Sequence, residues 1–201
     1  MDKKARLVIL ISGNGSNLQA ILDACEVGRL PARVLAVFSD RGQAYGLQRA
    51  EQRQIPTIII PPTPNRAFYD ADLAGQVAVF EPDWVVLAGW MRLLTMNFLS
   101  HFPNRVINLH PALPGQFPGV NAIERAFEAY RRGEISQTGV MVHLVPDEGV
   151  DDGPLLASQT VLILPGDTLE TLTARVHQVE HKLLVETLRG VVTGQIKPES
   201  L

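Results

Sequence analysis

Short apolar runs alternate with segments of helical periodicity through the first half of the chain. The first run, RLVILIS at 6–12, is rich in Val, Ile and Leu and has no polar alternation. Such a run is typical of a strand that is buried on both faces of a sheet. Further strands are expected at 33–40, 56–62 and 83–89, and helices at 16–28, 45–53 and 65–80. The alternation predicts βαβ units, and therefore a parallel sheet with helices on both faces.

The pattern changes in the second half of the chain. The last two apolar runs are separated only by PDEGVDDG, which is too short to hold a crossover helix, so we expect these strands to pair antiparallel. Asp167 and Glu170 are spaced as an N-terminal capping pair for the final helix. Strands are expected at 105–110, 139–145 and 154–164, and helices at 95–102, 121–133 and 166–190. The whole sequence predicts one α/β domain over 1–201, with a Rossmann-like parallel sheet in the first half, extended to a mixed sheet of about seven strands, and helices on both faces.

Composition excludes several classes of protein. At 201 residues and 46% hydrophobic, the chain can bury a sizeable core. A net charge of −3 and a pI of about 5.9 do not indicate the excess of positive charge that is typical of nucleic-acid-binding proteins. No segment reaches the length of a membrane span, and the N-terminal apolar run is interpreted as the first strand rather than a signal peptide. Cys25 is the only cysteine and lies on an apolar helical stripe, so we expect a packed thiol, no disulfide framework and a cytoplasmic location.

Two polar side chains interrupt the apolar stretch VINLHPALPG. Asn108 and His110 are two residues apart, so on a strand both project to one face, with Leu109 on the other. Pro111 lacks the N–H for the next ladder bond and, with the prolines after it, forces a loop. The pair is therefore expected at the carboxyl end of a strand, where open α/β sheets bind ligands. The alternative is a capped strand end with a structurally satisfied histidine.

The segment LISGNGSNLQ joins the first strand to the first helix. Gly13 and Gly15 permit a tight turn and a close approach of a ligand to the backbone. Ser16 and Asn17 add donors at the helix N-terminus, where free N–H groups and the helix dipole favour an anion. We interpret the turn as a site for a single phosphate. The alternative is a plain tight turn capped by Ser16.

Two familiar nucleotide-binding motifs do not fit this turn. A Walker A loop needs a lysine after its last glycine, and none follows here. The dinucleotide fingerprint Gly-x-Gly-x-x-Gly needs a glycine where Leu18 stands. Asp40, after the second strand, could nevertheless hold a nicotinamide ribose, so a dehydrogenase-type module stays open as an alternative.

The segment PDEGVDDG carries Asp147, Glu148, Asp151 and Asp152 between two strands. Clustered carboxylates suit a hard metal ion, and a carboxylate can also serve as the partner of a histidine. A solvated turn is the third interpretation. Because the preceding strand could pair near VINLH, the acids of this loop could reach His110.

Two histidines stand one turn apart on the last helix. His177 and His181 could chelate a metal from this spacing. However, HQVEH is not the His-Glu-x-x-His motif, since Glu180 sits beside the second histidine. We therefore expect no metal here, and interpret these residues as solvent-facing or in contact with a ligand.

Several segments, in order and spacing, resemble the phosphoribosylglycinamide formyltransferases, the folate-dependent transformylases of purine synthesis. The resemblance covers essentially the whole chain. It rests on LISGNGSNLQAILDAC, AVFSD, VVLAGWMRLL, INLHPALPG, GVDDGPLLASQ and TARVHQVEH, of which the first and fourth are the most specific. It implies a single formyltransferase-type domain whose residues 1–100 form the nucleotide- and phosphate-binding half and whose residues 101–201 form the catalytic and folate-binding half.

The resemblance also implies roles for individual residues. Asn108, His110 and Asp151 match the catalytic set. The phosphate of glycinamide ribonucleotide would lie on the turn of Gly13, Gly15, Ser16 and Asn17, and its ribose on Glu180. The folate would contact Arg66, Met91, Arg92, Leu93, Leu94, Asn108, Asp147, Glu148 and Val150.

The implied reaction moves a formyl group from N10 of 10-formyltetrahydrofolate to the glycinamide amine through a tetrahedral oxyanion. We expect Asn108 to direct its amide N–H groups at that oxygen, and a protonated His110 to donate to it and pass a proton to N10. Asp151 would favour the charged form of His110. The expected partners are these two small molecules, with no metal and no nucleic acid, and the chain is expected to be a monomer or homodimer.

One loop departs from the family pattern. The family commonly reads His-Pro-Ser-Leu-Leu-Pro, whereas this chain has Ala112, Pro114 and Gly115 in place of serine, leucine and proline. The length is kept, so His110 is expected to stay in place. Two related activities remain alternatives. A methionyl-tRNA formyltransferase would be expected to carry a further C-terminal domain and a basic surface, and a formyltetrahydrofolate deformylase a further N-terminal domain.

Overall fold

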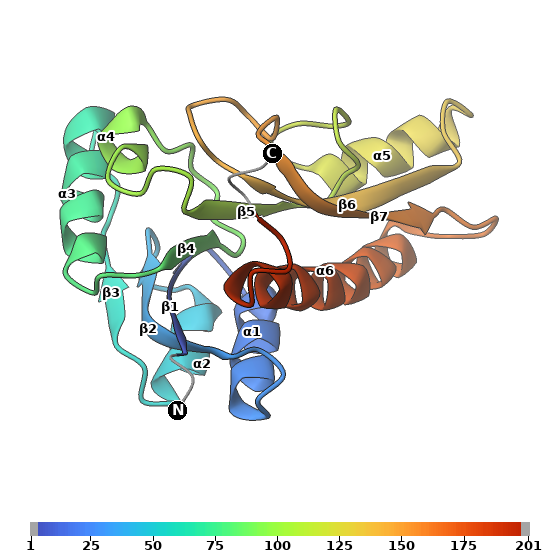
Figure 1. Cartoon of the computed structure of the whole chain (residues 1–201). Coiled ribbons are helices and arrows are strands. Elements are labelled where there is room, and N and C mark those ends of the chain that lie inside the picture. Colours follow the sequence, from blue (N-terminus) through green and yellow to red (C-terminus); the bar gives the residue numbers. More distant parts are fainter. Residues whose placement is uncertain (1–3, 198–201) are drawn as a thin grey trace.

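The computed structural model describes residues 4–197, whose strands form one mixed sheet in the order β3-β2-β1-β4-β5-β6-β7 (Figure 1). Strands β1 to β5 are parallel, and β6 runs antiparallel to both β5 and β7. The strands are β1 (Ala5–Ile11), β2 (Ala32–Ser39), β3 (Thr57–Ile59), β4 (Trp84–Leu87), β5 (Val106–His110), β6 (Gln137–Leu144) and β7 (Leu155–Leu162). The predicted α/β fold, with a parallel sheet extended by antiparallel strands, is confirmed.

Helices cover both faces of this sheet (Figure 1). One core contains apolar residues of α1, α2, α5 and α6, and a second core contains those of α3 and α4. The helices are α1 (Ser16–Glu26), α2 (Tyr45–Glu51), α3 (Arg66–Ala78), α4 (Met96–Leu99), α5 (Ala122–Arg131) and α6 (Leu169–Val192).

Strand β1 explains why its sequence lacks alternation. Leu7, Ile9 and Ile11 pack into the core beneath α1 and α6, whereas Val8 and Leu10 pack into the core beneath α3. All five side chains are fully buried. A strand between two helical layers is apolar on both faces, as the run at 6–12 predicts.

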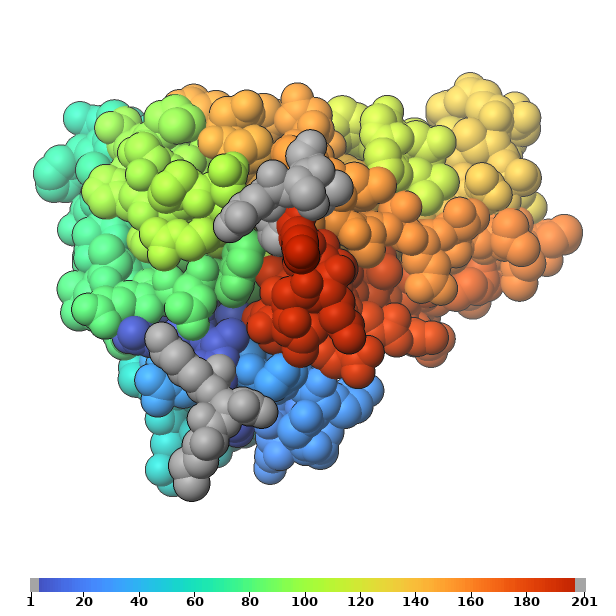
Figure 2. Space-filling model, viewed as in Figure 1, coloured from blue at the N-terminus to red at the C-terminus, as the bar shows by residue number. Residues whose placement is uncertain are grey.

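The long helix α6 joins the two halves of the chain. It packs against α1 in the first half and against α5, β6 and β7 in the second. Figure 2 shows its red surface between the blue N-terminal elements and the orange strands. None of the helices within residues 4–197 is long and apolar enough to cross a membrane.

The start of α6 corrects one prediction. The N-cap is Thr168, which accepts from the Thr171 N–H while the Thr171 hydroxyl accepts from the Thr168 N–H. The pair predicted from Asp167 and Glu170 is therefore wrong by one position. Asp167 accepts instead from the Arg175 guanidinium and the Leu164 N–H, because it lies before the first helical turn.

The structure also tests two smaller predictions, one about the extent of the third strand and one about Cys25. The strand expected at 56–62 is limited to Thr57–Ile59, since the flanking prolines cannot donate to a ladder. Cys25 packs against the core, and burial raises the pKa of its thiol to about 11, as expected for a packed rather than nucleophilic thiol.

Candidate active site

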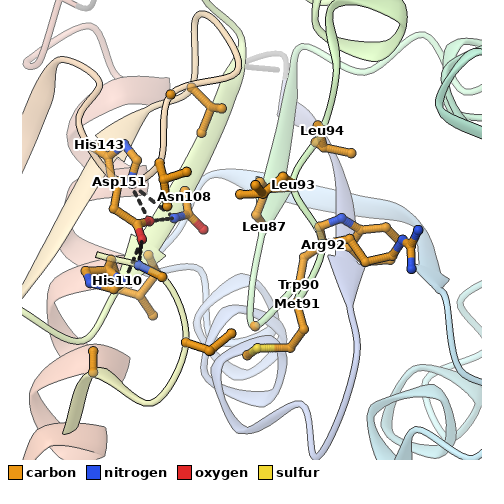
Figure 3. Close-up of a pocket in the computed structure, with 18 of the residues that line it drawn as sticks. Leu87, Trp90, Met91, Arg92, Leu93, Leu94, Asn108, His110, His143 and Asp151 are labelled. Carbon is orange, nitrogen blue, oxygen red and sulfur yellow. Dashed lines mark hydrogen bonds and ion pairs between the residues drawn. The ribbon is translucent and has the colours of Figure 1, made fainter. Parts of the chain in front are cut away.

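The end of β5 places Asn108 and His110 beside a carboxylate from a distant loop (Figure 3). Asn108 donates from Nδ2 to Asp151 Oδ1 at 3.0 Å, and His110 Nδ1 lies 3.2 Å from Asp151 Oδ2. The Gly119 N–H also donates to Asp151 Oδ2, at 2.8 Å. The acidic loop therefore reaches His110 through Asp151, whereas the neighbouring Asp152 is exposed and does not line the cavity.

Asp151 is held ionised by its surroundings. Burial raises the pKa of its carboxyl, but the hydrogen bond from the Gly119 N–H and the nearby His110 imidazole act against burial, and the pKa lies below its usual value. The backbone of Asp151 has φ +54°, in the left-handed region that aspartate tolerates better than most residues. This uncommon conformation aims the carboxylate back at β5.

His110 is almost fully buried, and both of its ring nitrogens have partners. Nδ1 faces Asp151, and Nε2 lies 3.0 Å from the Phe117 carbonyl oxygen. Burial lowers the pKa of the imidazole below its usual value, while Asp151 and the Phe117 carbonyl oppose that change. The histidine is thus structurally satisfied, as the alternative interpretation requires, but His110 and its partner Asp151 both line a cavity.

A second histidine, His143, completes the network and was not predicted. It stands directly opposite Asn108 in the antiparallel pairing of β5 and β6. His143 Nδ1 lies 2.8 Å from the Leu144 carbonyl oxygen, which can only accept, so Nδ1 carries the proton. Nε2 is then an acceptor, and it lies 3.1 Å from Asn108 Nδ2.

The Asn108 amide is oriented by these two acceptors. Its Nδ2 protons are directed to Asp151 and His143, and its oxygen points into the cavity (Figure 3). A flipped amide would set its oxygen against the Asp151 carboxylate, so the orientation follows from charge. We expected N–H groups on the cavity side. The structure presents the amide oxygen there instead.

A cavity of about 310 Å³ opens beside this network. Its opposite wall is mainly apolar, with Met91 and Leu93 partly exposed and Leu94 buried. Arg92 belongs to the same wall, but its guanidinium points away and lies 4.9 Å from the centre of the Tyr69 ring (Figure 3). The stretch expected to contact the folate therefore lines the cavity from the end of β4.

The acidic loop forms the rim of the cavity. Asp147 accepts from the Gly149 N–H, Glu148 accepts from the Met96 N–H at the start of α4, and Val150 faces the cavity. The carboxylates diverge to separate partners. Across residues 4–197, no group of three or more His, Cys, Asp or Glu side chains is arranged to hold a metal ion.

Arg66 is placed apart from the other residues expected in the folate pocket. It is the first residue of α3, and its Nε lies 3.9 Å from Asp70 Oδ2. It does not line the cavity. The structure thus brings Met91, Leu93 and Val150 together and leaves Arg66 outside.

The glycine turn adjoins this cavity at the end of β1. Ser12 donates its N–H to the Gly89 carbonyl, and its hydroxyl accepts from the Met91 N–H. Gly15 has φ +74°, and a Cβ there would lie 2.6 Å from Gly46 Cα, so glycine is required on both counts.

The structure rules out a cap by Ser16. Gly15 is the N-cap, and within the described residues no side chain caps α1. Asn17 is buried, and its Oδ1 has no hydrogen-bond partner among residues 4–197. The turn therefore presents uncapped helix N–H groups and an unpaired buried oxygen, which suits a ligand with both acceptors and donors.

Arg49 is a second residue near this turn that sequence analysis missed. From α2 its guanidinium donates to the backbone oxygen and Oδ1 of Asn14, both at 3.0 Å, and to Gln19 Oε1 at 3.1 Å. This places a positive charge beside the proposed phosphate site. The helical signal at 45–53 gave no indication that Arg49 faces the turn.

On α6, Glu180 is buried and binds the neighbouring histidine. Its Oε2 lies 2.5 Å from His177 Nδ1, and this hydrogen bond raises the pKa of His177. Burial lowers the pKa of His181. Helix α6 packs against α1, the helix that follows the glycine turn. Glu180 thus engages His177 Nδ1, whereas His181 Nε2 is buried without a hydrogen-bond partner among residues 4–197.

Comparisons with known proteins agree with this architecture. The formyl transferase family model matches residues 5–188. Phosphoribosylglycinamide formyltransferases of Schizosaccharomyces pombe and Dictyostelium discoideum are 45% and 43% identical to the chain, over 94% and 93% of it and 98% of each relative. The crystal structure of glycinamide ribonucleotide transformylase 1 from Symbiobacterium toebii is 41% identical, with a TM-score of 0.90 over 96% of this chain and 90% of that one. This chain belongs to the formyl transferase family.

Proposed function

We propose that this chain transfers the formyl group of 10-formyltetrahydrofolate to the amine of glycinamide ribonucleotide, giving formylglycinamide ribonucleotide and tetrahydrofolate in de novo purine biosynthesis. The observation that carries the proposal is the network of Asn108, His110 and Asp151 in the wall of a cavity that has an apolar opposite wall. Gly89 and Met91 of that cavity hydrogen-bond to Ser12, just before the glycine turn. The family to which the chain belongs, and the names of its relatives, support the same reaction.

The ribonucleotide is assigned to the glycine turn. Its phosphate would accept from the free N–H groups at the start of α1, next to Gly15 and Ser16, and Arg49 would add attraction. Asn17 and Glu180, both buried polar residues, would bind the sugar and orient it. In this proposal the first half of the chain holds the phosphate.

The folate is assigned to the cavity. Its aromatic parts would pack on Met91, Leu93 and Leu94, and its polar edge would face the loop that contains Asp147 and Glu148. The folate wall thus draws on both halves of the chain. Arg66 lies outside the cavity lining, so its contact would be with a part of the folate that extends beyond the cavity.

In the proposed reaction, the amine nitrogen bonds to the formyl carbon and the carbonyl becomes an oxyanion. The cavity-facing oxygen of Asn108 would accept an N–H of the amine and direct its lone pair at the carbon (Figure 3). The C–N10 bond then breaks, N10 gains a proton from His110, and the amine loses its proton to solvent, from which His110 is reprotonated. His110 would stabilise the oxyanion and protonate N10, with Asp151 orienting the imidazole.

His110 must give up one of its two hydrogen-bond partners before it can donate to the substrate. Its Nε2 faces the Phe117 carbonyl and its Nδ1 faces Asp151. Asp151 is needed to hold the ring, so Nε2 is the nitrogen that would turn its hydrogen bond from Phe117 to the substrate. No step of this scheme uses a metal ion or a covalent enzyme intermediate.

The test is formyl transfer by the purified chain with several acceptors. We expect formylation of glycinamide ribonucleotide, and neither comparable formylation of methionyl-tRNA nor comparable hydrolysis of the folate without an acceptor. A similar kcat/KM with methionyl-tRNA, or hydrolysis as the main activity, would overturn the assignment. Binding of NAD in preference to the ribonucleotide would favour a dehydrogenase-type module.

A further inference from the structure

One arginine of α5 holds the loop that follows β5. Arg125 donates from Nη2 to the carbonyl oxygens of Phe117 and Pro118, each at 2.6 Å. Its guanidinium also lies 5.9 Å from the centre of the Phe117 ring. Charge-assisted hydrogen bonds of this length are among the strong polar contacts of a protein. Two consecutive carbonyls are therefore fixed from outside the loop.

The loop needs such a restraint because its backbone is unusual. Phe117, Gly119 and Asn121 have φ values of +46°, +80° and +56°. Left-handed conformations are disfavoured for residues other than glycine, and they persist where surrounding contacts determine them. Arg125 supplies such contacts at the first of these positions.

Both ends of the His110–Asp151 pair depend on this same loop. The Phe117 carbonyl faces His110 Nε2 at 3.0 Å, and the Gly119 N–H donates to Asp151 Oδ2 at 2.8 Å. A change in the loop conformation would move both contacts together. The geometry of the pair is therefore linked to a residue that does not line the cavity.

We propose that Arg125 is a positioning residue for the formyl transfer, which holds the Phe117 and Pro118 carbonyls so that His110 and Asp151 keep their alignment while His110 Nε2 is released to the substrate. A carbonyl oxygen accepts two hydrogen bonds. When His110 turns to the substrate, Arg125 still satisfies the Phe117 oxygen, so the exchange leaves no buried acceptor unpaired. This inference rests on the proposed function.

The experiment compares Arg125→Ala and Arg125→Lys with a control, Arg131→Ala, which removes an exposed arginine from the same helix. Misplaced catalytic groups can lower a rate by about 10²-fold, so we expect Arg125→Ala to reduce kcat by about that factor with little change in either KM. Arg125→Lys should recover much of the rate, since an ammonium can donate to both carbonyls. Millimolar methylguanidine should partly restore Arg125→Ala, and Arg131→Ala should match the unaltered protein.

A second measurement tests the conformation of the loop independently of enzyme activity. Hydrogen exchange of the Gly119 amide should accelerate in Arg125→Ala, because its bond to Asp151 is loosened, and should be unchanged in Arg131→Ala. A folded Arg125→Ala protein with normal kcat and normal Gly119 exchange would overturn the proposal, as would a loss confined to KM. If the unaltered protein fails to formylate glycinamide ribonucleotide, the proposed function fails, and with it the positioning role of Arg125 in that reaction, whatever the Gly119 exchange shows.

Discussion

Asn108 and His143 face each other across the antiparallel pair of β5 and β6, with Asn108 Nδ2 3.1 Å from His143 Nε2. The second proton of Nδ2 is directed to Asp151. Two acceptors on one side of the amide leave its oxygen on the cavity side (Figure 3). His143 therefore acts with Asp151 to determine which end of the Asn108 amide a substrate meets, although His143 was not among the residues predicted from the sequence.

Replacement of His143 should release this orientation. In His143→Ala the amide loses one acceptor, so Asn108 can rotate, and we expect kcat to fall by about 10-fold to 10²-fold with a smaller effect on either KM. His143→Gln keeps an acceptor near the position of Nε2 and should lose less. Steady-state kinetics on both variants, with thermal unfolding to confirm the fold, is the measurement. Equal losses in the two variants would contradict an orienting role.

Asp151 and Asp152 provide a matched pair of neighbouring carboxylates. Asp151→Asn keeps a residue that tolerates the left-handed backbone, but its amide would set an N–H against the Asn108 or Gly119 donor. We expect kcat to fall on the order of 10²–10⁴-fold with little change in either KM. Asp152→Asn should be far milder, because that side chain is exposed. A folded Asp151→Asn protein with near-normal kcat would remove Asp151 from the proposed catalytic set.

Those parts of the site that depend on local sequence pattern could be predicted from the sequence alone. Asn108 and His110 both lie on strand β5, where their i, i+2 spacing places the two side chains on the same face, as predicted. Gly15 likewise sits at a turn that only glycine fits, since its φ is positive and Gly46 packs against it. Both features are set within a few residues of chain.

Features that depend on contacts between distant segments were not predicted. His143 faces Asn108 only through the register of β5 and β6, and a single strand pattern does not specify a register. The direction of the Asn108 amide depends in turn on that pairing. Arg125 could not be identified either, because its partners are backbone oxygens of a loop. The backbone conformation of that loop, including its positive φ values, cannot be predicted from its amino-acid composition.

Asn17 tests the assignment of the ribonucleotide to the glycine turn. Its Oδ1 is buried without a partner among the described residues, so a ligand hydroxyl or amine is the expected donor. A lost hydrogen bond costs about 1 kcal/mol or more, so Asn17→Ala should raise the KM for the ribonucleotide several-fold to about 10-fold, and that for the folate less. Asn97→Ala, at an exposed position on α4, is the control. Equal rises in both KM values would favour a structural turn.

Chelation tests the expectation that the reaction uses no metal. The proposed chemistry uses the Asn108 oxygen as an acceptor and His110 as a donor, and the acidic carboxylates bind backbone N–H groups or the site histidines. Prolonged dialysis against EDTA should therefore leave kcat unchanged. A loss of activity that zinc restores would instead assign a ligand role to His177, His181 or the acidic loop.

The pair of His177 and Glu180 predicts how stability changes with pH. Its hydrogen bond to Glu180 raises the pKa of His177 above the ordinary value of 6.5, so the folded state binds this proton more tightly than the unfolded state. The stabilisation is complete below 6.5 and is lost as the pH rises through the higher pKa of the folded state.

His177→Gln should therefore lower the unfolding temperature most in mildly acidic solution, and the difference from the unaltered protein should shrink as the pH rises. His101→Gln, which removes an exposed histidine whose ring lies 6.3 Å from that of Phe102, is the control and should show no such trend. The measurement is thermal unfolding of all three proteins across a pH series in one buffer system. A difference that stays constant, or that grows with pH, would show that the charge on His177 does not stabilise the fold through Glu180.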